Sequence, residues 1–100
     1  IAITPKNCRV RHTLGSLQIQ ENRWGPAVET LEAVFEHCPN ASYLWDVYRL
    51  LAVSFYYQEQ PDQALQLANE ALRLAPDEQK QVVEQLIAAI QQPAAGQSEP

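Results

Sequence analysis

Residues 48–76 read YRLLAVSFYYQEQPDQALQLANEALRLAP and contain two successive helical patterns. Apolar and small residues recur every three or four positions, first at Tyr48, Leu51, Ala52 and Phe55 and again at Ala64, Ala68 and Ala71. This spacing places each set on one face of an α-helix. Gln60-Pro61-Asp62 separates the two patterns, and Pro61 suits the first position of the second helix. We therefore expect two antiparallel helices joined by a short turn.

The rest of the chain has the same character. Ala, Leu, Gln and Glu make up 45 of the 100 residues, and all four are strong helix formers. Thr4-Pro5 is typical of a helix start, with Thr4 as the cap. We predict an all-α protein with an N-terminal extension at 1–4, a disordered tail at 92–100, and helices at about residues 5–21, 26–38, 41–58, 61–75 and 77–91.

A shift of 37 residues aligns the chain with itself. Leu14-Gly15 falls on Leu51-Ala52, Ala27 falls on Ala64, and Pro39 falls on Pro76. Small residues at such positions let two helix backbones approach closely, and a proline ends each helix pair because it cannot continue the hydrogen-bond ladder. The repeat indicates that one helix pair stacks on a second copy of itself. A generic helical bundle with chance self-similarity is the alternative.

This pattern resembles the tetratricopeptide repeat over roughly residues 8–91, and the second unit matches its signature best. In the first unit Arg11 and Gln18 stand where the second has Tyr48 and Phe55. The 37-residue period also exceeds the 34 residues of the family, and we expect the surplus at Asn40 to Leu44, as a longer link or an extended third helix. The resemblance implies a short α-solenoid of two antiparallel helix pairs, with the helix at 77–91 as a C-terminal cap.

The family holds peptides or proteins in a concave groove lined by the first helix of each pair. Matching positions predict a mixed cationic, polar and aromatic lining made of Arg9, His12, Ser16, Ile19, Asp46, Arg49, Val53, Tyr56, Tyr57, Lys80 and Val83. In the alternative interpretation, Arg49 only pairs with Asp46 and the tyrosines complete the core. One subtype grips C-terminal carboxylates with Lys and Asn residues, but His12, Ser16, Arg49 and Val53 stand in those places. That specific function is not expected.

Cys8, His12, His37 and Cys38 are the only cysteines and histidines, and an antiparallel hairpin brings them to one end. Two reduced, buried thiols are the first expectation. A Cys8–Cys38 disulfide is the second, and it implies an oxidising compartment such as a periplasm or lumen rather than the otherwise favoured cytoplasm. A zinc site is the third, although adjacent residues on a helix point about 100° apart and do not readily share one ion. We predict no metal and no cofactor.

The net charge and the absence of catalytic sequence motifs exclude several classes of function. The net charge is −5, which disfavours nucleic-acid binding, and no apolar run reaches the ~18 residues of a membrane span. Phosphate loops, metalloprotease motifs and nucleophile elbows are absent from the sequence, and we predict no enzyme activity. The leading hypothesis is a protein-interaction module, an adaptor, scaffold or assembly factor that binds a protein or peptide. Stacking into homo-oligomers is the alternative, because residues 1–23 are basic and the remainder is acidic.

Overall fold

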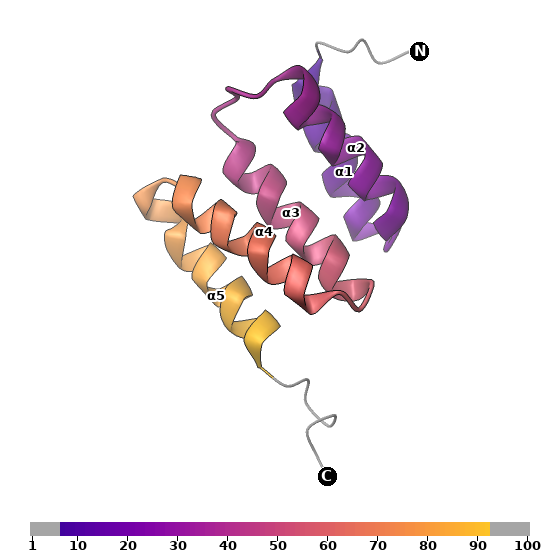
Figure 1. Ribbon diagram of the computed structural model, residues 1–100. Helices are drawn as coiled ribbons and strands as arrows, with labels where there is room; N and C mark the ends of the chain where they lie inside the picture. Colours follow the sequence, from indigo (N-terminus) through magenta and orange to yellow (C-terminus); the bar gives the residue numbers. More distant parts are fainter. Residues whose placement is uncertain (1–6, 93–100) are drawn as a thin grey trace.

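The computed structural model describes residues 7–92, and that part of the chain is helical, with no strand (Figure 1). Its elements are α1 (Cys8–Gln20), α2 (Trp24–His37), α3 (Leu44–Tyr57), α4 (Pro61–Leu74), the short 3-10 turn η1 (Asp77–Gln79) and α5 (Lys80–Gln91). The predicted all-α class is confirmed. The predicted cap at Thr4-Pro5 and nearly all of the predicted tail lie outside the described residues.

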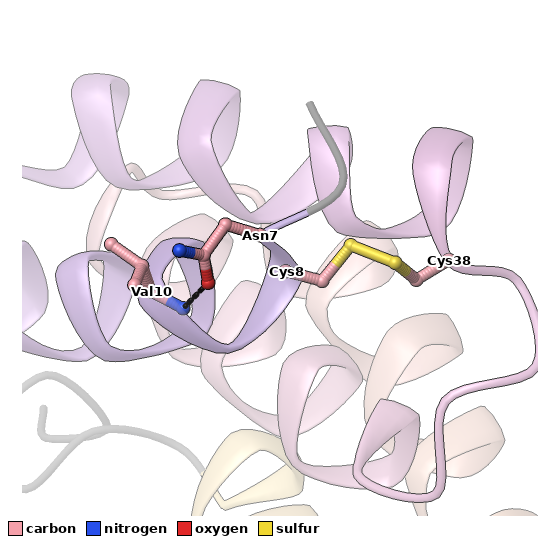
Figure 2. Close-up of a disulfide and its surroundings, with 4 residues drawn as sticks. All are labelled: Asn7, Cys8, Val10 and Cys38. Atoms are coloured by element: carbon pink, nitrogen blue, oxygen red, sulfur yellow. Dashed lines mark hydrogen bonds between the residues drawn. A yellow bond between two sulfur atoms is a disulfide. The ribbon is translucent and has the colours of Figure 1, made fainter. Parts of the chain in front are cut away.

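The helix ends refine the predicted boundaries. The α1 helix begins at Cys8, where the Asn7 side chain accepts a hydrogen bond from the Val10 amide at 3.3 Å (Figure 2). The α2 helix begins two residues before Pro26, and α4 begins at Pro61 as predicted. The α3 helix begins at Leu44, so the surplus of the first repeat is a longer link and not an extended helix.

The two hairpin turns close in the same way, 37 residues apart. Asn22 and Glu59 both adopt a left-handed backbone, with φ of 62° and 65°. The next amide in each turn then reaches back to the helix, from Arg23 to the Gln18 carbonyl at 2.8 Å and from Gln60 to the Phe55 carbonyl at 2.9 Å. The repeat seen in the sequence is therefore also a repeat of backbone geometry.

The five helices stack in chain order. The α1–α2 hairpin packs against the α3–α4 hairpin mainly through α2 and α3, and α5 packs against α4 at the far end (Figure 1). The first helices of the units also touch, α1 against α3 and α3 against α5. This is a short α-solenoid of two helix pairs and a final helix, as the sequence predicted. Within residues 7–92 no helix is long and apolar enough to cross a membrane.

Small residues sit where helices meet. Gly15 and Ala27 are buried in the first hairpin, and Ala52, Ala64 and Ala68 are fully buried around the second. The side chain closest to Gly15 is Leu31, one turn beyond the predicted Ala27, and a Cβ at Gly15 would lie 2.6 Å from Leu31 Cγ. The absence of a side chain at Gly15 thus permits the close contact of α1 and α2.

The first unit has polar side chains at two repeat positions where the second unit has aromatic ones, and each of these polar side chains has a buried polar atom. Arg11 Nε and Gln18 Oε1 are buried without a hydrogen-bond partner among the described residues. These two residues replace the aromatic Tyr48 and Phe55 of the second unit. In that second unit Phe55 packs against the apolar core, and Tyr48 packs there and also meets the Phe35 ring at 4.5 Å. The two units therefore differ at these two positions, which are polar in the first unit and aromatic in the second.

Candidate functional site

A polar cluster joins the first helices of the two hairpins. Asp46, in the first turn of α3, accepts hydrogen bonds on both carboxylate oxygens. His12 Nε2–H of α1 donates to Oδ2 at 2.6 Å, and Arg49 Nε–H donates to Oδ1 at 2.7 Å. The His12 and Asp46 side chains are each 19% exposed, so the pair is partly shielded from water. The carboxylate fixes the orientation of an imidazole and a guanidinium on the same face.

Asp46 keeps its negative charge within this cluster. Burial raises the pKa of the carboxyl group, but the hydrogen bonds from His12 and Arg49 and the positive charges of these groups lower it more. The net pKa lies below the ordinary value of 3.8. At neutral pH the cluster therefore holds a carboxylate, and the carboxylate balances the charge of Arg49.

Tyr43 completes the cluster, and sequence reasoning missed it. Its ring stacks on the His12 ring with centroids 4.8 Å apart and planes within 2°. The Arg9 guanidinium carbon lies 5.0 Å from the Tyr43 ring centroid, a cation–π distance. Tyr43 lies in the link before α3, within the segment that makes the first repeat longer than the 34 residues of the family. The family pattern therefore has no position that corresponds to Tyr43. An aromatic residue in that link was the only available signal.

Two hollows flank the wall formed by Arg9, Tyr43 and His12. One, of about 300 Å³, lies between α1 and the start of α3 and is lined by His12, Thr13, Ser16, Leu17, Gln20 and Asp46. The other, of about 490 Å³, lies beside the link and is lined by Asn7, Cys8, Arg9, His37, Cys38, Pro39, Asn40, Ala41 and Tyr43. Of the predicted lining, the structure thus brings together Arg9, His12, Ser16, Asp46 and Arg49.

The remaining predicted residues are placed elsewhere. Tyr56 packs against the core shared by α3, α4 and α5, while Ile19 packs against the core shared by α1, α2 and α3, and Val83 is fully buried. Tyr57 stacks on Trp24 of α2 at 4.6 Å, away from the polar cluster.

Lys80 has a structural contact. Its Nζ donates to the Leu72 carbonyl at 2.9 Å, and this contact satisfies a carbonyl in the last turn of α4. The ammonium group is therefore engaged at the junction of α4 and α5 rather than held open for a partner. Val53 is half-buried on α3, and nothing in the structure links it to the cluster.

Cys8 and Cys38 form a disulfide that closes the open end of the first hairpin (Figure 2). Reduced thiols, the first expectation, are wrong for this structure, because the hairpin brings the two Cα atoms to 6.5 Å. The zinc alternative also fails, since both sulfurs are used in the S–S bond. Within residues 7–92 no three His, Cys, Asp or Glu side chains gather as a metal site would require.

The stacked hairpins, with their repeated turns and small interface residues, define a helical-repeat protein of the solenoid class. Residues 45–78, which span most of α3, all of α4 and the start of η1, match the family model of the tetratricopeptide repeat. The family resemblance of the second unit is thereby confirmed. No curated protein and no solved structure matches the chain.

Proposed function

We propose that the chain is a non-catalytic protein-interaction module that holds a peptide or protein segment on the face shared by α1 and α3. The match to the tetratricopeptide repeat supports the general role, because this family mediates contacts between proteins. The polar cluster supports the location of the contact. Adaptor, scaffold and assembly factor are all roles that such a module can serve.

The observation that carries the proposal is the Arg9–Tyr43–His12 wall between two hollows. Arg9 is exposed over an aromatic ring, and within residues 7–92 it has no acidic ion-pair partner. Arginine and tyrosine combine large contact area with polar reach, and both are frequent in interface hot spots. Asp46 orients His12 before any partner arrives, so little ordering is needed on binding. A segment with an acidic side chain beside an apolar one suits this wall.

Peptide selection on the immobilised, disulfide-bonded chain tests the proposal. A random-peptide display library is selected for binders, and the affinity of the best peptide is measured by fluorescence anisotropy. We expect Arg9→Ala and Tyr43→Ala each to weaken binding about tenfold or more, as for a hot-spot residue worth about 1.4 kcal/mol. Circular dichroism checks that both variants remain helical.

Glu32→Ala is the matched control, because Glu32 is an exposed residue of α2 away from the cluster. It is expected to leave the affinity unchanged. A library that yields no binders contradicts the proposal, and so do binders that tolerate both the Arg9 and the Tyr43 substitution. Binders that Glu32→Ala weakens equally would place the interface elsewhere.

We further propose that the chain works in an oxidising compartment. The Cys8–Cys38 disulfide supports this, because such bonds are rare in proteins kept under reducing conditions. Trapping thiols with an alkylating reagent of high mass in the cells that make the protein gives the test. We expect no labelling until a reductant is added, whereas immediate labelling of both cysteines would contradict the proposal.

A further inference from the structure

The first helix leaves an apolar stripe on its outer side. Val10, Leu14 and Leu17 follow one another at helical spacing, opposite the buried Cys8 and Gly15. Val10 is 42% exposed and Leu17 is 48% exposed. With Thr13 and Arg9, the three residues line a shallow depression of about 370 Å³. Nothing in the described chain covers this α1 stripe.

The last helix carries a second stripe with the same spacing. Val82, Leu86 and Ala89 repeat the interval of four and then three residues that separates Val10, Leu14 and Leu17. Val82 is 45% exposed, Leu86 is half-buried and Ala89 is exposed. Because α1 and α5 lie at opposite ends of the stack and do not touch each other, this α5 stripe cannot cover the α1 stripe of the same molecule (Figure 1).

The two ends also differ in charge. The α1 helix contains Arg9 and Arg11 and no acidic residue. The segment Asp77–Gln91 contains three acidic residues and one lysine, with two of the acids in its first turn. Of the two arginines only Arg9 is exposed, and it lies near the N-terminal end of α1, just as the exposed Asp77 and Glu78 lie directly before α5. Parallel packing of α1 on α5 would therefore join the apolar stripes and bring opposite charges together.

We infer that copies of this chain associate head to tail, with the α1 stripe of one copy against the α5 stripe of the next. The interface is heterologous, since two different surfaces meet. Each added copy leaves one free stripe at either end, so further copies can add in the same way. Arg9 lies at the edge of both this interface and the Arg9–Tyr43–His12 wall, whereas Tyr43 and His12 lie outside the α1 stripe.

Two variants, each blocked at one end, test the arrangement. Leu17→Glu places a charge in the α1 stripe, and Val82→Glu places one in the α5 stripe. By sedimentation velocity we expect the unmodified chain to form larger species as its concentration rises, and each variant alone to remain monomeric. An equimolar mixture of the two variants is expected to form a one-to-one dimer and nothing larger, because one intact stripe of each kind remains.

Leu74→Glu is the control, since Leu74 is a 40% exposed residue of α4 outside both stripes. It should assemble like the unmodified chain, and circular dichroism should show all variants equally helical. An unmodified chain that stays monomeric overturns the inference, and assembly only after deletion of residues 1–6 would show that this segment covers the α1 stripe instead. Dimers of Val82→Glu alone would mean that two α1 stripes meet, which also overturns it.

Discussion

Replacing Gly15 by alanine tests how closely α1 approaches α2. A Cβ at Gly15 would lie 2.6 Å from Leu31 Cγ and 3.3 Å from Leu31 Cδ1, well inside a normal carbon–carbon contact. Leu31 has no exposed surface, so it cannot swing into solvent to make room. Overpacking of this kind costs about 1–3 kcal/mol of unfolding free energy. Alanine also favours the helix by about 1 kcal/mol relative to glycine, which offsets part of the loss.

Gly25→Ala supplies the matched comparison. Gly25 is also helical, but a Cβ built there meets no atom within 4 Å. Gly25 lies in the first turn of α2, where alanine gains less helix propensity than at the interior position of Gly15, so the difference between the two unfolding free energies is a lower bound on the overpacking cost. We expect Gly15→Ala to be less stable than Gly25→Ala by up to about 3 kcal/mol.

Urea unfolding followed by circular dichroism, with the disulfide intact, measures both variants. Adding Leu31→Ala to Gly15→Ala should give a loss smaller than the sum of the single losses by about 0.5 kcal/mol or more, because the two side chains compete for one space. Equal stability of the two glycine variants, or strict additivity with the Leu31 substitution, would refute the close contact.

Three further outcomes follow. Asp46→Asn should cost about 1.5–3 kcal/mol at pH 7. Because the folded pKa of Asp46 is lowered, its carboxylate stabilises the fold above the ordinary pKa of 3.8 and loses this effect as the pH falls through the folded value, so the difference in unfolding free energy, measured by urea unfolding, should shrink as the pH falls below 3.8. Reduction of Cys8–Cys38, which closes a loop of about 30 residues, should cost about 3.5–4 kcal/mol in the chain-entropy estimate and lower the Tm, whereas an unchanged Tm contradicts it. Glu59→Gly should stabilise by about 0.5–1 kcal/mol by relieving a left-handed backbone, and Asn22→Gly by less, because Asn tolerates that conformation; calorimetry decides between this order and its reverse.

The fold could be predicted because its determinants are local. Helical spacing and the proline at Pro61 depend only on neighbouring residues, and the structure has the helices they indicate. The helix starts were less accurate. Nothing in the sequence distinguishes Ala41 from Leu44 as the start of α3, because the link is held by long-range packing and not by a strong capping residue.

The sequence predicted some residues of the candidate site but not all of their contacts. Arg9, His12 and Asp46 follow from repeat position, since that position determines which face of α1 and α3 they occupy. Tyr43 lies in the link, and its stacking on His12 depends on how the hairpins meet. The contact of Lys80 with the Leu72 carbonyl could not be predicted, because it depends on how α5 packs against α4.

A nuclear magnetic resonance titration with a peptide selected on the chain tests the central claim most directly. Backbone amide shifts of the ¹⁵N-labelled chain are followed as the peptide is added. The largest changes are expected at Arg9, His12, Tyr43, Asp46 and Arg49, with no change along the exposed acidic side of α2. Changes concentrated on α2 or on α4, with the α1–α3 residues unmoved, would contradict the assignment of this face as the binding surface.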